Sequence, residues 1–347
     1  MCSRILLSGL VGLGAGTGLT YLLLNRHSPT QIIETPYPPT QKPNSNIQSH
    51  SFNVDPSGFF KYGFPGPIHD LQNREEFISC YNRQTQNPYW VLEHITPESL
   101  AARNADRKNS FFKEDEVIPE KFRGKLRDYF RSGYDRGHQA PAADAKFSQQ
   151  AMDDTFYLSN MCPQVGEGFN RDYWAHLEYF CRGLTKKYKS VRIVTGPLYL
   201  PKKDPIDNKF RVNYEVIGNP PSIAVPTHFF KLIVAEAPTA NPAREDIAVA
   251  AFVLPNEPIS NETKLTDFEV PIDALERSTG LELLQKVPPS KKKALCKEVN
   301  CQIVVRDFSN AAIKQSKDVK LLPPPKKKEL NVLKNCKYKL IHNTTIE

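Results

Sequence analysis

Apolar side chains form two kinds of run along the chain: short stretches rich in branched and aromatic residues, and longer stretches with helical spacing. The short runs predict strands, because such residues favour an extended backbone. They cover residues 90–92, 190–195, 229–235 and 247–254. The longer runs predict helices over residues 97–103, 148–156, 170–189 and 272–278, the last ending before Gly280, a normal C-cap residue. Strands separated by long loops, and only sometimes by helices, favour the α+β class, with a mainly antiparallel central sheet flanked by helices.

The predicted helix that begins at residue 170 has two different faces. Apolar residues at helical spacing form one stripe for the core: Tyr173, Leu177, Phe180 and Leu184. Every fourth residue runs along another face: Asn170, Trp174, Glu178 and Arg182. Such a helix can present an amide, a carboxylate and a guanidinium group together, while Trp174 is expected to serve packing. An ordinary surface ion pair between Glu178 and Arg182 is the alternative interpretation.

The N-terminal part of the chain differs from the rest in composition. Residues 5–24 contain no charged side chain and are long enough to span a bilayer. Arg4 precedes this run and the first acidic residue is Glu34. Residues 1–27 are therefore predicted to be a mitochondrial import signal that can remain as an inner-membrane anchor. Residues 28–57 are rich in Pro, Thr, Ser, Asn and Gln, which predicts a linker.

Positive charge is concentrated near the C-terminus. The 347-residue chain has 46 Lys and Arg against 38 Asp and Glu. From residue 286 onward there are 15 basic and 5 acidic side chains, which leaves 31 basic and 33 acidic residues elsewhere. We expect residues 58–286 to form the folded domain and residues 287–347 to form a basic, solvated C-terminal extension. The net charge is therefore weak support for a basic nucleic-acid groove within the domain.

The seven cysteines show no Cys-x-x-Cys pair. This spacing argues against a zinc site and against a disulfide framework. Cys162 lies beside the stretch with the candidate chemistry, and its neighbours favour a small core residue over a nucleophile.

The most chemically suggestive stretch is Asp-Arg-Gly-His at residues 135–138. Histidine can take a proton from water near neutral pH, and arginine matches phosphate oxygens with two parallel donors. Glycine permits a tight bend or a close approach of the backbone, because it has no Cβ atom. The combination fits hydrolysis of a phosphodiester. Considered alone, these four residues could also be a surface turn with a salt bridge.

Further motifs follow in order: Tyr-Leu-Ser-Asn at 157–160, Pro-Gln at 163–164 and the helix over 170–178. Flanking matches occur at 89–94, 106–108, 195–198 and 251–255. With residues 135–138, this pattern resembles the DNA/RNA non-specific nucleases of the ββα-metal class, above all the mitochondrial endonuclease G family, over residues 60–284. The loop over 160–170 is one residue longer than the family pattern, so the metal-ligand assignment depends on which residue is extra.

The resemblance implies a central antiparallel sheet with packed helices and a ββα catalytic element. His138 would be the general base that activates water. Asn170 would bind Mg²⁺, or Mn²⁺ in its place, through its side-chain oxygen. Glu178 would hold metal-bound waters. Hard oxygen ligands and retained waters are what Mg²⁺ prefers in proteins.

Five other positions match the family pattern or stand beside it. Phosphate-binding roles are implied for three arginines: Arg107, Arg136 and Arg182. Asp135 and Asn160 would orient their neighbours and, through them, the substrate.

The same resemblance implies an endonuclease, with exonuclease action also open, that cleaves DNA and RNA and leaves 5′-phosphate ends. It implies a homodimer in the mitochondrial inner membrane or intermembrane space, which degrades mitochondrial nucleic acid or fragments nuclear DNA in cell death. Two other classes remain open from the residues themselves. One is an inactive nucleic-acid-binding protein that uses the basic tail, and the other is a membrane-tethered structural protein.

Overall fold

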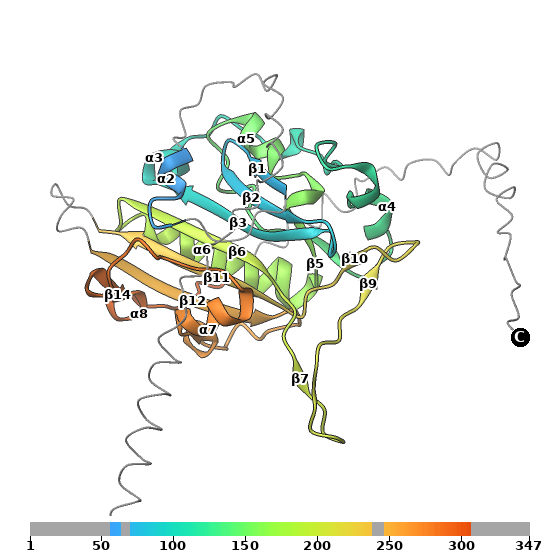
Figure 1. The fold of residues 1–347 in the computed structure, drawn as a ribbon. Coiled ribbons are helices and arrows are strands. Elements are labelled where there is room, and N and C mark those ends of the chain that lie inside the picture. The colour runs from blue at the N-terminus through green and yellow to red at the C-terminus, as the bar shows by residue number, and fades with distance from the viewer. Residues whose placement is uncertain (1–55, 64–69, 238–245, 307–347) are drawn as a thin grey trace, which may run out of the picture. The chain divides into compact units, whose positions relative to one another are not determined.

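An eight-stranded sheet runs through the part of the chain that the computed structural model describes, residues 56–63, 70–237 and 246–306 (Figure 1). Its strands are β1 (Asp70–Asn73), β2 (Phe77–Asn82), β3 (Asn87–Ile95), β6 (Ser190–Leu198), β11 (His228–Glu236), β12 (Ile247–Pro255), β13 (Glu269–Val270) and β14 (Lys292–Ala294). The order is β1-β2-β3-β6-β11-β12-β13, and β14 also pairs with β12. The β12–β14 pair is parallel and the other pairs of this sheet are antiparallel. The predicted α+β class is confirmed.

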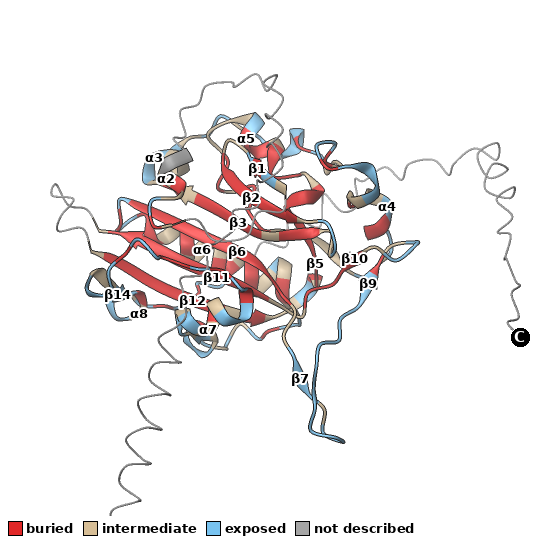
Figure 2. Ribbon diagram, viewed as in Figure 1, coloured by how far each residue is buried: buried red, intermediate tan, exposed pale blue. Residues whose placement is uncertain are grey.

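The four predicted strands are the four central strands of this sheet, and each is longer than its apolar run. Every residue of β6 is buried, and so are eight of the nine residues of β11. Figure 2 shows this burial along the middle of the sheet. Strands covered on both faces give continuous apolar runs, which is why these four could be recognised. The more polar β1 and the bulged β2 could not.

Three small two-stranded sheets lie outside the main sheet. They pair β4 (Asp135–His138) with β5 (Met161–Gln164), β7 (Lys202–Lys203) with β8 (Phe210–Arg211), and β9 (Val216–Ile217) with β10 (Ile223–Ala224). The β7–β8 hairpin projects away from the main sheet (Figure 1). The β4–β5 hairpin carries the candidate catalytic residues.

The helices are mostly short. They are α2 (Pro56–Phe59), α3 (Pro97–Ala101), α4 (Leu126–Tyr129), α5 (Gln149–Asp154), α6 (Trp174–Leu184), α7 (Ile272–Thr279) and α8 (Leu295–Glu298). Single turns of 3-10 helix are η1 (Arg107–Asn109), η2 (Glu120–Phe122), η3 (Leu158–Asn160), η6 (Leu265–Phe268) and η7 (Pro289–Lys291). The predicted C-cap of α7 is confirmed, because Gly280 has the left-handed φ of 72° there.

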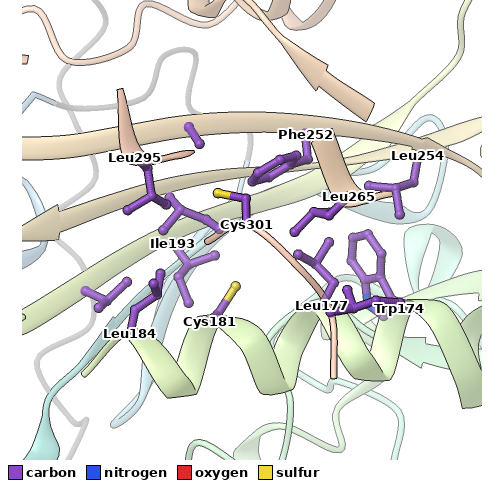
Figure 3. Close-up of a cluster of buried hydrophobic side chains, with 14 of the residues drawn as sticks. Trp174, Leu177, Cys181, Leu184, Ile193, Phe252, Leu254, Leu265, Leu295 and Cys301 are labelled. Atoms are coloured by element: carbon purple, nitrogen blue, oxygen red, sulfur yellow. The ribbon is translucent and has the colours of Figure 1, made fainter. Parts of the chain in front are cut away.

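Helix α6 lies against one face of the sheet and buries its apolar side there (Figure 3). The buried side chains of the helix are Trp174, His176, Leu177, Cys181 and Leu184. All of these except His176 belong to one cluster with Ile193 of β6 and Phe252 of β12. Trp174 therefore serves packing, as predicted, whereas Phe180 is only partly buried at the edge of this cluster. The opposite face of the sheet forms a second cluster that includes Trp90 and Phe230 and is covered by Leu275 of α7.

Residues 287–306 belong to the folded domain, although the sequence placed its end at residue 286. Strand β14 adds to the sheet edge at β12, and Leu295 is fully buried beneath it. A disulfide joins Cys296 to Cys301. The sequence argued against a disulfide framework and missed this bond, because only the fold of α8 and the following turn brings the two thiols together. Cys162 is buried, as expected for a core residue.

Both termini of the chain, residues 1–55 and 307–347, lie outside the described residues. The predicted import segment, almost all of the linker and most of the basic extension fall there. Within the described ranges, no helix has the length and apolar character needed to cross a membrane.

Candidate active site

The candidate site is built on the β4–β5 hairpin and the helical segment that follows it. On β4, Arg136 pairs with Pro163 and His138 with Met161 of β5. Alternate residues of a strand point to the same face, so Arg136 and His138 share one face of β4. Asp135 and Gly137 lie on the other.

Gly137 allows a close approach, as its position in the motif suggested, but the approaching group is a side chain of the protein. A Cβ atom at this position would lie 1.8 Å from Gln164 Oε1. That is far inside any van der Waals contact, so no larger residue fits while Gln164 keeps its place. The glycine is thus explained by packing between the two strands.

Asp135 connects the hairpin to the segment after β5. Its Oδ2 accepts hydrogen bonds from Asn170 Nδ2 at 2.9 Å and from Arg171 Nε at 2.7 Å, while Oδ1 accepts from Arg171 Nη2 at 2.8 Å. Burial alone would raise the pKa of the Asp135 carboxyl, but these hydrogen bonds and the charge of Arg171 outweigh burial and lower it. A Cβ atom on Gly166 would lie 2.3 Å from Arg171 Nη2, so this glycine leaves room for the pair.

Asn170 lies in a π-helical segment, η4 (Gly166–Tyr173), that runs into α6. The Asn170 N–H donates to the Val165 carbonyl, and the Trp174 N–H donates to the Phe169 carbonyl. Both bonds span five residues, whereas an α-helix spans four. A π turn accommodates one additional residue and often occurs at functional sites. It gives a physical account of the extra residue noted in the sequence. The single helix predicted over 170–189 is instead the end of this π-helical segment followed by α6, which ends at Leu184.

His138 is half-buried between two phenylalanine rings. The Phe112 and Phe156 ring centroids lie 5.6 Å and 4.9 Å from that of the imidazole. Nε2 is buried without a hydrogen-bond partner among the described residues, which leaves Nδ1 as the nitrogen that can reach water. Burial lowers the pKa of His138 well below its usual value, and the charges of Arg107 and Arg136 lower it further. The imidazole is therefore neutral at pH 7.

Glu178 lies two turns beyond Asn170, on α6. Burial raises the pKa of its carboxyl to about 7, against the lowering effect of nearby Lys231, Arg182 and Arg107. Asp144 adds to the raising effect and binds Arg182, with 2.8 Å between Asp144 Oδ1 and Arg182 Nη1. The alternative interpretation from sequence, an ordinary surface ion pair between Glu178 and Arg182, is thus not what the structure has, because Arg182 forms a buried pair with Asp144.

Asn160 lies beneath the hairpin and is fully buried. Its Oδ1 accepts from the Ala140 N–H at 2.9 Å, and its Nδ2 donates to the carbonyls of Ala140 at 2.9 Å and Thr155 at 2.8 Å. Every polar atom of the amide group is occupied by backbone. Asn160 therefore orients the chain just after His138 and cannot touch the substrate itself.

Arg107 opens the 3-10 turn η1 and is exposed. Asp106 caps this turn by accepting from the Lys108 N–H, and the Asp106 N–H donates to Gln149 Oε1 at 2.9 Å. The turn is thus attached to α5. Arg107 is close enough to both His138 and Glu178 to influence their titration.

Five residues around the site had no role in the sequence-based interpretation: Arg171, Asp144, Lys231, Phe112 and Phe156. Arg171 lies inside the recognised motif, directly after Asn170, and this position could have indicated a role for it. Asp144 and the two phenylalanines have no local pattern that points to the site, because their positions follow from tertiary packing alone.

The oxygen of the Asn170 amide is suited to a hard divalent cation. Its amide nitrogen is held by Asp135, and its Oδ1 has no hydrogen-bond partner among the described residues. The described residues contain no group of three or more His, Cys, Asp or Glu side chains arranged to hold a metal ion. A site with a single neutral protein ligand fits Mg²⁺, which keeps several waters.

Comparison with known proteins identifies the family. A model of the DNA/RNA non-specific endonuclease family matches residues 55–290, which include the hairpin, η4 and α6. The chain belongs to this family. It is therefore an endonuclease, a hydrolase that acts on the phosphodiester bonds of DNA and RNA.

The endonuclease is 99% identical over 328 residues to the mitochondrial nuclease of Saccharomyces cerevisiae, which covers 94% of this chain and 100% of that protein. It is 43% identical over 221 residues to the mitochondrial endonuclease G of Homo sapiens, with 64% of this chain and 71% of that protein covered. A crystal structure of an EndoG/EndoGI complex, which concerns the mechanism of EndoG inhibition, contains a chain with a TM-score of 0.64 and 44% identity. The match covers 69% of this chain and 97% of that one. The predicted ββα-metal nuclease fold is confirmed.

Proposed function

We propose that the endonuclease hydrolyses phosphodiesters with a water that His138 deprotonates, at a site completed by a divalent cation on Asn170. The observation that carries this proposal is the 2.9 Å hydrogen bond from Asn170 Nδ2 to Asp135 Oδ2. It fixes the amide so that its oxygen remains for a cation, and it does so from the strand that also holds His138.

His138 is the general base in this proposal. Its lowered pKa keeps the imidazole neutral, so that Nδ1 can accept a proton from the attacking water. A positioned base contributes about 10²–10⁴-fold in rate. The water attacks phosphorus in line with the leaving 3′ oxygen, and the products carry 5′-phosphate and 3′-hydroxyl groups.

Asn170 would hold Mg²⁺ or Mn²⁺ through Oδ1, and Glu178 would hold the waters of the ion from α6. When bound, the ion offsets the negative charge that develops on the phosphate and the leaving oxygen. Lys231 and Arg182 support Glu178 in this role, because their charges favour its carboxylate form. Asp144 in turn holds Arg182 in position at 2.8 Å.

Arg136 and Arg107 flank His138 and bind phosphate oxygens of the substrate in this proposal. Contacts to the phosphate backbone carry no sequence information, which accounts for cleavage of both DNA and RNA. Because these contacts are electrostatic, we expect binding to weaken as the salt concentration rises. The phosphate contact predicted for Arg182 remains a prediction, since its guanidinium already pairs with Asp144.

In the cellular part of the proposal, the mitochondrial location follows the names of the relatives, and the other elements follow the family resemblance of the sequence. The endonuclease acts in mitochondria, as a homodimer attached by its N-terminal segment to the inner membrane or free in the intermembrane space. There it degrades mitochondrial nucleic acid by internal cleavage and from ends, and after release it fragments nuclear DNA in cell death. Fractionation of cells before and after induced death separates these uses by showing which compartment contains the activity.

The chemistry is tested with the full chain, wild type beside His138→Ala, on closed circular DNA and on single-stranded RNA. We expect the wild type to nick the circle and degrade the RNA with Mg²⁺ but not with EDTA, and the variant to lose about 10²–10⁴-fold in rate. Equal activity in the variant would contradict the proposed base. Binding of DNA by both proteins without cleavage would instead favour a nucleic-acid-binding protein.

A further inference from the structure

Two phenylalanine rings contact His138, and an arginine side chain lies over each ring. The Arg136 guanidinium lies 4.0 Å from the centre of the Phe112 ring. The Arg107 guanidinium lies 5.2 Å from the centre of the Phe156 ring. The two phenyl rings meet edge to face at 5.1 Å, and the imidazole of His138 contacts both. The five side chains form one continuous cluster.

We propose that Phe112 and Phe156 are positioning residues of the endonuclease, an aromatic clamp that fixes the base and two phosphate-binding arginines as one unit. The inference rests on the proposed roles of His138, Arg107 and Arg136. Neither phenylalanine reacts or binds metal. Each acts by holding the groups that do.

Stacking on a ring leaves an arginine free to bind phosphate. A guanidinium group stacks through its flat face, while its five N–H donors point outward from its edge. Neither Arg107 nor Arg136 has a hydrogen bond from its guanidinium to another described residue. The rings can therefore set the orientation of both groups without using the donors that a phosphate needs.

The two halves of the clamp are fixed to each other by backbone hydrogen bonds. The Lys113 N–H donates to the Phe156 carbonyl at 3.1 Å, and the Leu158 N–H donates to the Lys113 carbonyl at 2.9 Å. Phe156 is only 3% exposed, so its ring has little freedom to turn away. The distance between the rings is consequently set by the fold and does not depend on substrate.

Each arginine is also joined through its own chain segment to the clamp. Arg136 stands two residues before His138 on β4 and shares its face, next to Phe112. Arg107 opens η1, which Gln149 of α5 holds through Asp106, and the chain after α5 leads directly to Phe156. Each ring therefore has a preferred arginine: Phe112 for Arg136, and Phe156 for Arg107.

This pairing is tested by double-mutant cycles in the full chain. Phe112→Leu and Phe156→Leu keep apolar volume but remove the aromatic face, and Arg136→Lys and Arg107→Lys keep the charge but remove the planar group. The matched pairs are Phe112 with Arg136 and Phe156 with Arg107. In each matched pair, the double variant should lose about 3- to 10-fold less kcat/KM than the product of the losses in the two single variants. In the crossed pairs the coupling should be clearly smaller, because each ring reaches the other arginine only through the neighbouring ring.

Three further variants separate positioning from stability and from the proposed chemistry. Phe112→Tyr keeps the ring and should retain activity close to wild type, whereas Phe112→Leu should lower kcat at similar unfolding midpoint. Phe111→Leu, a neighbour whose ring is 75% exposed, should change neither quantity. His138→Ala is included in every assay. Full activity of that variant would overturn the proposed function, whatever the cycles give.

The clamp itself is overturned by any of three results. The first is equal coupling in the matched and crossed pairs. The second is wild-type kcat/KM in the two leucine variants. The third is a loss of kcat/KM in these variants that their lower unfolding midpoints explain completely. Coupling that is clearly larger in the matched pairs, with His138→Ala inactive, supports the clamp.

Discussion

At residue 135 a single carboxylate accepts hydrogen bonds from two side chains that have different tasks. Asn170 uses one of these bonds to hold its amide in a fixed orientation, and Arg171 uses two to close the loop before α6. A neutral amide can point either its oxygen or its NH₂ group outward, and only the oxygen can bind a cation. The charge of Asp135 removes that ambiguity, because a carboxylate accepts hydrogen bonds and cannot donate them.

We therefore expect Asp135→Asn to lower kcat by about 10–100-fold, the usual effect of losing a partner that orients a metal ligand. Cleavage of circular DNA over a range of Mg²⁺ concentrations measures this, and the Mg²⁺ requirement should rise. Asp70→Asn is the matched control, because Asp70 also accepts two bonds from one arginine, Arg83, at 2.5 Å each, far from the motif in sequence. Equal losses in both variants would show that the effect is one of general stability.

At the scale of elements, the central strands could be predicted because each is buried on both faces and appears as an apolar run. Helix α6 could be predicted from its spacing, but its beginning could not. The π turn at Asn170 is a backbone geometry that the spacing of apolar residues does not indicate. The residues Asp135–His138 were recognised by their motif and not as a strand, since four residues have no periodicity of their own. The supporting side chains at Phe112 and Phe156 depend on loops whose course the sequence does not indicate.

Strands β6 and β11 also share a buried ion pair, Arg192 with Glu236, which makes stability depend on pH. Burial would raise the pKa of Glu236, but Arg192, Tyr62 and Lys61 outweigh it and lower the value to about 2. Because the pKa of Glu236 is lower in the folded protein, its carboxylate stabilises the fold at pH values above the unfolded-state pKa of about 4.3. This stabilisation is lost as the pH falls through the folded-state pKa. The full effect is about 3 kcal/mol.

Urea unfolding of wild type and Glu236→Gln between pH 7 and pH 3 tests this. The wild type should be more stable at pH 7, and the difference between the two proteins should shrink as pH falls below about 4. Glu269→Gln, at an exposed glutamate of β13, should leave the stability unchanged at every pH. A constant difference between wild type and Glu236→Gln would contradict the assignment.

For the whole molecule, the position at which the domain ends determines how the C-terminal extension can be studied. Val287 to Arg306 complete the fold through β14, α8 and the Cys296–Cys301 disulfide. Leu295, Cys301 and Ile303 all join the cluster that α6 forms with the sheet. A chain that ends at Arg306 keeps every described element, so it tests what the basic residues beyond Arg306 contribute to binding.

We expect a chain that ends at Arg306 to nick circular DNA as fast as the full chain at moderate salt, with weaker dependence of binding on salt if the tail contacts phosphates. A chain that ends at Val287 should lose stability, because Leu295 alone contributes about 2–5 kcal/mol when fully buried. Thermal unfolding and nicking rates measured on both chains test this. If the chain that ends at Arg306 keeps its fold but loses all DNA binding, the residues beyond Arg306 are favoured as the binding element.

The position of β14 and α8 near the end of the described chain also sets when the packing around α6 can be completed during synthesis. The ribosome releases His138, Asn170 and Glu178 long before Leu295, yet α6 buries its apolar side against β6, β12 and Leu295 together. The catalytic segment therefore lacks its complete support until nearly all of the described chain has emerged.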